Sequence, residues 1–151
     1  MVNDPAVELV SVCTPNDTHA EISIAALAAG KHVWCEKPMS TSLADSQAMT
    51  DAAAASSGRT IIGYNYTKNP AVTHARRLIE SGVIGRVAAF FCRYDVDNEA
   101  DGDRPWSWRM SRDQSGTGAN GDVLSRVISV AHYLTGSTIK RVVGDIAIVH
   151  G

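Results

Sequence analysis

Short apolar runs alternate with alanine-rich segments over the first 66 residues, and this alternation constrains the fold more than any other feature. The runs Glu8–Cys13, His32–Cys35 and Thr60–Tyr64 have the length of strands and contain few polar residues. Strands separated by helices of this size pair in parallel through right-handed crossovers. Because the runs are apolar throughout, we expect helices to cover both faces of the parallel sheet.

Two helices are predicted between these strands, each from a signal at its start and a glycine after its end. The first begins with the capping-box pattern from Thr18 to Glu21 and stops at Gly30. The second begins at Ser42 and stops at Gly58. The first part of the chain is therefore predicted to be β-α-β-α-β.

After residue 66 the pattern changes to longer strands without short crossovers. We predict a helix, a strand, a polar loop, a second helix and a last strand, over Asn69–Ser81, Arg86–Val96, Asp97–Gln114, Asp122–Thr135 and Arg141–His150. This order is typical of an α+β domain with a mainly antiparallel open sheet. We place the domain boundary so that residues 1–66 end a parallel-sheet domain and residues 67–151 begin the second. Both sheets would keep uncovered edges, so we expect both chain ends to be cut from a longer protein.

The composition excludes several classes of protein. The formal net charge is −2 and the cations are scattered, unlike the basic footprint of a nucleic-acid binder. No apolar run approaches the roughly 20 residues that cross a membrane, and no signal peptide is visible, so we expect a cytoplasmic protein without membrane partners. Cys13, Cys35 and Cys92 are odd in number and lie in apolar runs, which indicates buried free thiols. No histidine spacing indicates a metal site.

Polar residues follow the first two predicted strands, at the edge where parallel sheets bind ligands. The loop Thr14–Asn16 suits a ribose or phosphate contact, although a plain β-α turn explains its spacing equally well. The element Glu36–Pro38 places a lysine beside a carboxylate, and such a lysine can donate a proton to a carbonyl oxygen. The bond before its proline can be cis. From local chemistry alone, the favoured interpretation of this element is an exposed turn with a Glu36–Lys37 ion pair.

A glycine run and the helix after it form the third candidate region. Gly116–Gly121 matches G-x-G-x-x-G, but a polar segment precedes it instead of a strand. We therefore expect a flexible approach to a helix and not a pyrophosphate site. Asp122 and Arg126 are four residues apart and share one helix face, either as a simple ion pair or as a polar pair that faces a cleft. Trp106 and Trp108 either anchor their own loop or form the wall of a pocket.

Several of these segments, taken in order, resemble the glucose–fructose oxidoreductase and inositol dehydrogenase family. They are Cys13–Asn16 with His19, Ala29–Val33, Glu36–Pro38, Gly63–Tyr66, Asn69-Pro70, Ile79–Gly85, Trp108-Arg109 and Gly116–Asp122. The resemblance implies the second half of a Rossmann-type domain that binds NAD or NADP. It implies that part of an α+β domain follows, whose open sheet forms homo-oligomers. It also implies hydride transfer between the nicotinamide and a hydroxyl or carbonyl group of a sugar, inositol or related small molecule.

The same resemblance implies roles for individual residues. Those on the cofactor side are Thr14, Pro15, Asn16, His19, Glu36, Lys37, Trp108 and Arg109. The implied catalytic residues are Lys37 as acid and base, Asp122 orienting the substrate or Lys37, and Arg126 contacting the substrate. The choice between NAD and NADP stays open, because the residue that reads the ribose 2′ position belongs to a segment that this sequence does not contain.

Two departures from the family pattern affect these roles. The glycine-rich first turn is missing, and Arg126 stands where many dehydrogenases of the family carry a histidine. Arginine stays protonated and cannot act as a base, so Lys37 must take more of the proton transfer. Arg126 can instead bind an anionic group of the substrate or stabilise a developing alkoxide. The alternative is a catalytically inactive member that acts as a binding, regulatory or oligomerisation module.

Overall fold

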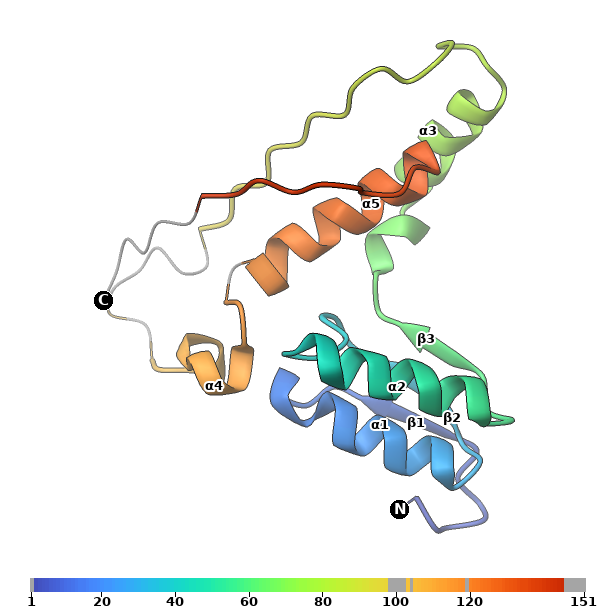
Figure 1. Cartoon of the computed structure of the whole chain (residues 1–151), viewed down its shortest axis with the longest axis vertical. Coiled ribbons are helices and arrows are strands. Elements are labelled where there is room, and N and C mark those ends of the chain that lie inside the picture. Colours follow the sequence, from blue (N-terminus) through green and yellow to red (C-terminus); the bar gives the residue numbers. More distant parts are fainter. Residues whose placement is uncertain (1, 98–102, 104, 119, 146–151) are drawn as a thin grey trace.

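The computed structural model describes residues 2–97, 103, 105–118 and 120–145 of the 151-residue chain. A compact layer of strands and helices occupies one end of the molecule, and an arm built on two helices extends from it (Figure 1). A short helix from late in the chain returns to the layer and packs against the turn that follows its first strand. This return brings together residues that are about 100 positions apart, such as Asn16 and Ser115.

The layer contains a parallel sheet in the order β1-β2-β3, as the sequence predicts. Its strands are β1 (Leu9–Val12), β2 (His32–Cys35) and β3 (Thr60–Ile62). Val12 pairs with Cys35, and Cys35 pairs with Ile62. The carboxyl ends of all three strands therefore lie at the same edge of the sheet.

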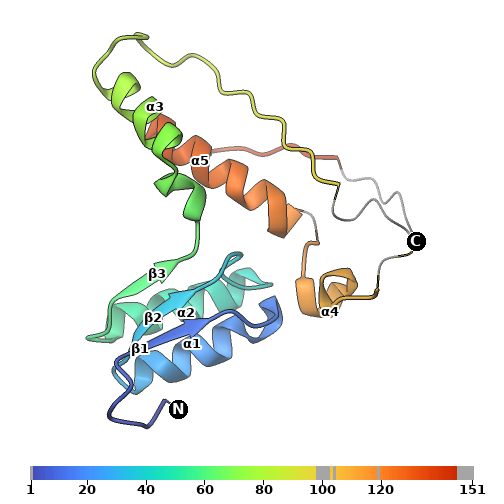
Figure 2. The same cartoon turned by 180° about the vertical axis from the view of Figure 1, so that it is seen from behind.

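Helices α1 (His19–Ala28) and α2 (Leu43–Ala55) lie side by side on one face of the sheet (Figures 1 and 2). Between these helices and the sheet lies the core, which consists of Val10, Val12, Ala20, Ala26, Leu27, Val33, Cys35 and Met49. The prediction that helices cover both faces is wrong for the described residues, because Trp34 on the other face is 43% exposed. Two right-handed crossovers that step in the same direction across the sheet place both helices on the same side.

The starts of the two helices differ in how they are capped. The Ser42 hydroxyl accepts a hydrogen bond from the Asp45 N–H at 3.1 Å, which confirms the predicted start of α2. The capping box at Thr18 is wrong, because a 3-10 turn, η1 (Asn16–Thr18), precedes α1. The Thr18 backbone is already helical there, and its hydroxyl lies 2.8 Å from the Pro15 carbonyl oxygen instead.

The arm joins a helix that follows the sheet to a helix near the end of the chain. A 3-10 turn η2 (Asn65–Lys68) leads into α3 (Pro70–Glu80), and Asn69 caps α3 by accepting from the Ala71 N–H. α3 packs against α5 (Ser125–Thr135), which ends at Gly136 with φ of 65°. The segment before α5 holds η3 (Trp108–Met110), α4 (Arg112–Ser115) and a π-helical turn η4 (Asn120–Leu124). None of the described helices combines the length and the apolar character that a membrane crossing requires.

The predicted long strands Arg86–Val96 and Arg141–His150 are wrong over the residues that the structure describes. Residues 86–97 and 137–145 have no regular secondary structure, and residues 146–150 lie outside the described part. A strand forms only when its N–H and C=O groups pair with a neighbour, and neither segment has such a neighbour within the described ranges. Phe91 is 92% exposed for the same reason. The antiparallel sheet of the second domain is therefore not formed here, and the boundary between residues 66 and 67 stays a prediction.

The three cysteines are free, but only one of them is buried. Cys35 packs in the core, and burial raises the pKa of its thiol. Cys13 and Cys92 are exposed, which corrects the prediction that all three are buried. Cys13 follows the last residue of β1, and Cys92 belongs to the unpaired segment 86–97, so neither has a covering layer.

Candidate functional site

A cleft of about 760 Å³ opens where the carboxyl ends of β1 and β2 meet the segment from η3 to α5. Its described lining comes from three stretches of the chain. These contribute Cys13, Thr14, Asn16 and His19, then Glu36, Lys37 and Pro38, and finally Val96, Trp108, Arg109, Met110, Ser115, Gly118, Asp122, Val123 and Arg126. The cleft thus unites the sheet edge with the late segment that the sequence singles out, although no local pattern links them.

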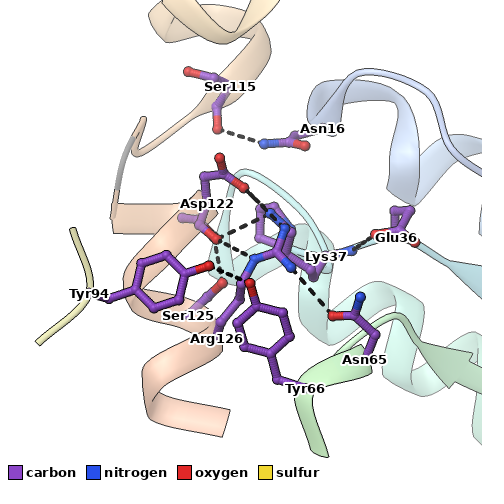
Figure 3. A network of polar contacts seen from close by, with 12 residues as sticks. Asn16, Glu36, Lys37, Asn65, Tyr66, Tyr94, Ser115, Asp122, Ser125 and Arg126 are labelled. Carbon is purple, nitrogen blue, oxygen red and sulfur yellow. Dashed lines mark hydrogen bonds and ion pairs between the residues drawn. The ribbon is translucent and has the colours of Figure 1, made fainter. Parts of the chain in front are cut away.

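The buried side chain of Asn16 joins the two walls of the cleft. Its Nδ2 donates to the Ser115 carbonyl oxygen at 3.0 Å (Figure 3). Ser115 is the last residue of α4, so this bond supplies a partner for a carbonyl that the helix end leaves open. Asn16 therefore fixes the late segment against the sheet edge, a role that its position in the sequence does not reveal.

His19 lies beneath the cleft and connects its two loops. The residue is 1% exposed at the start of α1. Its Nδ1 lies 2.9 Å from the Pro38 carbonyl oxygen, and its Nε2 lies 3.0 Å from the Thr14 carbonyl oxygen. Both ring nitrogens thus contact backbone carbonyl oxygens. His19 therefore holds the loops after β1 and β2 in place, and neither of its nitrogens is left for a ligand.

Lys37 lines the cleft and pairs with Asp122 of the π-helical turn η4 (Figure 3). Its Nζ forms an ion pair with the Asp122 carboxylate and lies 3.1 Å from the Asp122 carbonyl oxygen. The Lys37 side chain is only 8% exposed. The predicted surface ion pair with Glu36 is therefore wrong, because the lysine turns inward to a carboxylate 85 residues away. The Lys37–Pro38 bond is cis, as the sequence allows.

The environment of Asp122 keeps its carboxylate charged. Partial burial alone would raise the pKa of this carboxyl group, but the hydrogen bond and charge of Lys37 act in the opposite direction. Arg126 and Arg109 add to that effect, and the net result is a pKa below its ordinary value of 3.8. Lys37 is thus held by a carboxylate that remains ionised near neutral pH.

Arg126 lies one helical turn after Asp122 and is held on three sides. Its Nε lies 3.2 Å from the Asp122 carbonyl oxygen, its Nη1 donates to Asn65 Oδ1 at 3.3 Å, and its Nη2 lies 3.7 Å from Asp122 Oδ1. The guanidinium also lies over the Tyr66 ring, 5.0 Å from its centroid. The Tyr66 hydroxyl is hydrogen-bonded to that of Tyr94 (Figure 3). The predicted pairing of Asp122 and Arg126 on one helix face is confirmed.

Asn65, Tyr66, Tyr94 and Ser115 are site residues that the sequence reasoning missed. A signal existed for the first two, because they belong to the family-like segment Gly63–Tyr66. Nothing in the local pattern marks Tyr94, which lies in a stretch that we predicted to be a strand, or Ser115, which contributes only its carbonyl oxygen.

Of the remaining predicted residues, Glu36, Trp108 and Arg109 line the cleft, and Trp106 and Pro15 do not. The Glu36 carboxylate lies against Gly63, where an added Cβ would come within 2.9 Å of its Oε1, so a side chain there would displace the carboxylate. The Arg109 guanidinium lies 4.4 Å from the centroid of the Trp108 ring, and both residues line the cleft. Trp106 is exposed and does not contribute to the lining. Pro15 sits between Thr14 and Asn16 but does not line the cleft itself.

The cleft suits part of a nucleotide cofactor. It lies at the carboxyl edge of parallel strands, where such sheets bind nucleotides, and polar residues from the ends of β1 and β2 form its wall. The glycine run Gly116–Gly121 follows α4 and not a strand, and its last two residues belong to η4. Its flexibility and the absence of a pyrophosphate site stay predictions. Within the described residues, no group of three or more histidine, cysteine or acidic side chains is placed to hold a metal ion.

Comparisons with known protein families match both parts of the chain. The model of the oxidoreductase family with an NAD-binding Rossmann fold matches residues 1–64. The model of the GFO/IDH/MocA C-terminal domain matches residues 72–151.

Individual curated relatives are also oxidoreductases by name. Levoglucosan dehydrogenase of Pseudarthrobacter phenanthrenivorans is 43% identical over 136 residues, which are 90% of this chain and 35% of that protein. The 1,5-anhydro-D-fructose reductase of Ensifer adhaerens is 35% identical over 82% of this chain and 36% of that protein. The chain therefore spans about a third of the length of these curated relatives.

Among solved structures, levoglucosan dehydrogenase in complex with NADH and levoglucosan superposes with a TM-score of 0.86 at 43% identity. The match covers 89% of this chain and 37% of that one. An inositol dehydrogenase homologue from Azotobacter vinelandii, complexed with NAD+, gives a TM-score of 0.71 at 29% identity, over 89% and 36% of the two chains.

Proposed function

Because the chain belongs to the GFO/IDH/MocA oxidoreductase family, we propose that the protein containing it is an NAD(P)-dependent dehydrogenase. It transfers hydride between the nicotinamide and a hydroxyl or carbonyl group of a sugar, inositol or related small molecule. The observation that carries the proposal is the ion pair between the buried Lys37 and the partly exposed Asp122, in a cleft at the carboxyl edge of the parallel sheet. The names of the relatives, which include dehydrogenases and a reductase of sugar-like molecules, support the same activity.

The cofactor would be held by residues at the strand ends. Thr14, Pro15 and Asn16 form the loop after β1, and Glu36 forms the rim after β2. Trp108 and Arg109 face them from the late segment. When bound there, the nicotinamide supplies the carbon that accepts or returns the hydride. NAD and NADP both remain compatible with these residues.

Lys37 is the residue that moves the proton. In the reducing direction its ammonium group donates a proton to the carbonyl oxygen of the substrate as the hydride reaches the carbon. In the oxidising direction the neutral amine takes the proton of the hydroxyl group. Asp122 accepts a hydrogen bond from Nζ and aims it at the cleft, so it is a positioning residue for Lys37. Arg126 cannot take this proton because a guanidinium stays protonated.

Three further expectations stay predictions from the sequence. They are homo-oligomerisation through the open sheet of the second domain, a cytoplasmic location, and the division at residues 66 and 67. The inactive alternative, a binding or regulatory module, receives no support from the relatives, whose names describe oxidoreductases.

The test uses the full-length protein that contains this chain. Lys37→Met keeps the length of the side chain but removes the transferable proton, so kcat for NADH-linked turnover should fall about 10²- to 10⁴-fold. NADH affinity, measured by fluorescence titration, should change little. Lys140→Met, at an exposed lysine away from the cleft, is the matched control and should keep wild-type kcat. Unchanged turnover in Lys37→Met, or no NADH or NADPH binding by the wild type, would reject the proposal.

A further inference from the structure

We propose that Arg126 makes this site selective for a substrate that carries a carboxylate, that is, a sugar acid or a comparable hydroxy acid. This inference rests on the proposed function, because it concerns the substrate of the same cleft. The inference is supported by the N–H donors of Arg126, by the charges that line the cleft, and by the ion pair that Asp122 already forms with Lys37.

Arg126 has more N–H groups than the described residues accept hydrogen bonds from. A guanidinium carries five N–H groups in a fixed plane. Hydrogen bonds of Nε with the Asp122 carbonyl oxygen and of Nη1 with Asn65 Oδ1 engage two of them, whereas Nη2 lies at the ion-pair distance of 3.7 Å from Asp122 Oδ1. Among the described residues, Nη2 has no hydrogen-bond acceptor, so its N–H groups can bind a ligand. Two N–H groups on one guanidinium edge match the two oxygens of a carboxylate.

The second argument is that the guanidinium is held in place before any ligand arrives. Arg126 lies over the Tyr66 ring, and its contacts with Asn65 and Asp122 fix two directions of the plane (Figure 3). Its side chain is 24% exposed and lines the cleft, so part of it faces the space that a substrate would fill. A donor group that is already oriented loses little conformational entropy when it binds a ligand.

The third argument is that Asp122 does not require Arg126 as a counter-ion. Lys37 already pairs with the Asp122 carboxylate through a direct contact, whereas the nearest Arg126 nitrogen to that carboxylate is 3.7 Å away. A purely structural role would predict the closer contact for the arginine. The positive charge of Arg126 is therefore only partly compensated.

The fourth argument is the charge balance of the whole cleft. Its described lining contains the cations Lys37, Arg109 and Arg126 and the carboxylates Glu36 and Asp122. Lys37 is paired with Asp122, and the Arg109 guanidinium lies over the Trp108 ring. The described lining residues carry one positive charge in excess, and Arg126 at the start of α5 lies one turn after Asp122, the η4 residue that positions Lys37. A monoanionic substrate would complete this balance, with its carboxylate at Arg126 and its reacting carbon near Lys37.

The test measures substrate preference with the full-length protein and a panel of hexuronic acids, each paired with its neutral hexose. For at least one pair we expect the acid to exceed the neutral sugar in kcat/KM by about 10-fold or more. Arg126→Gln should raise KM for that acid about 10- to 100-fold, and by a clearly larger factor than it raises KM for the neutral sugar. Arg126→Lys, which keeps the charge but loses the paired donors, should recover part of the loss. Arg141→Gln, at an exposed position outside the cleft lining, is the control.

Two outcomes would overturn this inference while leaving the proposed dehydrogenase intact. One is a preference for the neutral sugar in every pair. The other is an equal effect of Arg126→Gln on acid and neutral sugar. Direct calorimetric titration of the acids covers the case without turnover: binding that Arg126→Gln weakens supports the inference, and the absence of binding rejects it. Loss of NADH binding, by contrast, would count against the proposed function alone.

Discussion

The sheet layer and the arm show how differently two halves of one chain are stabilised. In the layer, each strand has a neighbour and the helices cover one face, so residues such as Val12 and Ala26 are almost completely buried. In the arm, α3 and α5 pack on each other, but residues 86–97 and 137–145 lie without strand partners among the described residues. In the layer, strands that are close in sequence pair with one another. In the arm, residues 86–97 and 137–145 do not pair with each other as strands, so they need another strand beside them.

The largest difference between the halves should appear in hydrogen exchange of the 151-residue chain. Amides of β1, β2 and α1 are hydrogen-bonded around the core, whereas those of residues 86–97 are not bonded to a neighbouring strand. We expect the former to exchange about 10³-fold more slowly or better, because exchange there requires opening of the core. Equal protection of both halves, measured by mass spectrometry, would show that segment 86–97 is paired.

A pair of matched truncations compares the halves at the level of single side chains. Leu27→Ala removes a buried side chain between α1 and the sheet and should lower the free energy of unfolding by about 2–5 kcal/mol. Val143→Ala removes a fully exposed one and should change it by less than about 0.5 kcal/mol. Urea unfolding of the chain and its two variants gives both numbers. Similar losses in the two variants would contradict the contrast.

Asn16→Ala tests the junction between the halves. The substitution leaves the Ser115 carbonyl oxygen without its side-chain donor and should cost about 0.5–1.5 kcal/mol of stability. The protein should also bind NADH less tightly, because the wall formed by α4 is released from the sheet edge. Asn69→Ala, which removes the cap of α3 outside the cleft lining, is the control: it should lower stability by a similar amount but leave NADH binding unchanged.

The smallest expected effect is the pH dependence that Asp122 contributes. Its pKa in the folded state is lower than in the unfolded state, since Lys37 stabilises the carboxylate. Its contribution to stability is therefore complete above the ordinary value of 3.8 and is lost as the pH falls through the depressed pKa. Stability curves of wild type and Asp122→Asn should converge in acid, separate as the pH rises to 3.8, and keep a constant gap above it. Curves that run parallel from acid to neutral pH would exclude this contribution.

Elements with local partners could be predicted from the sequence, and elements with distant partners could not. The three strands and the starts at Ser42 and Asn69 follow from short-range signals, and the structure confirms them. The capping box predicted at Thr18 is wrong because Thr18 is the last residue of the 3-10 turn η1. The strand predicted at Arg86–Val96 is wrong because residues with high β propensity form a strand only when a neighbouring strand pairs with them. The sequence does not show whether such a strand is present.

The same distinction applies to the candidate site. The resemblance to a known family singled out Lys37, Asp122 and Arg126, and the structure brings all three into one cleft. Local chemistry alone favoured a Glu36–Lys37 pair, because neighbours in sequence are the only partners that a local pattern can weigh. The true partner lies 85 residues away, and only the fold brings it close.

The central claim is that Lys37 and Asp122 act as one catalytic unit across the junction of the two halves. A double-mutant cycle of kcat with Lys37→Met, Asp122→Asn and the double variant in the full-length protein tests it most directly. If Asp122 acts only through Lys37, the double variant should be no slower than Lys37→Met alone, within about a factor of two. Losses that multiply in the double variant would show that the two residues act independently and would contradict the claim.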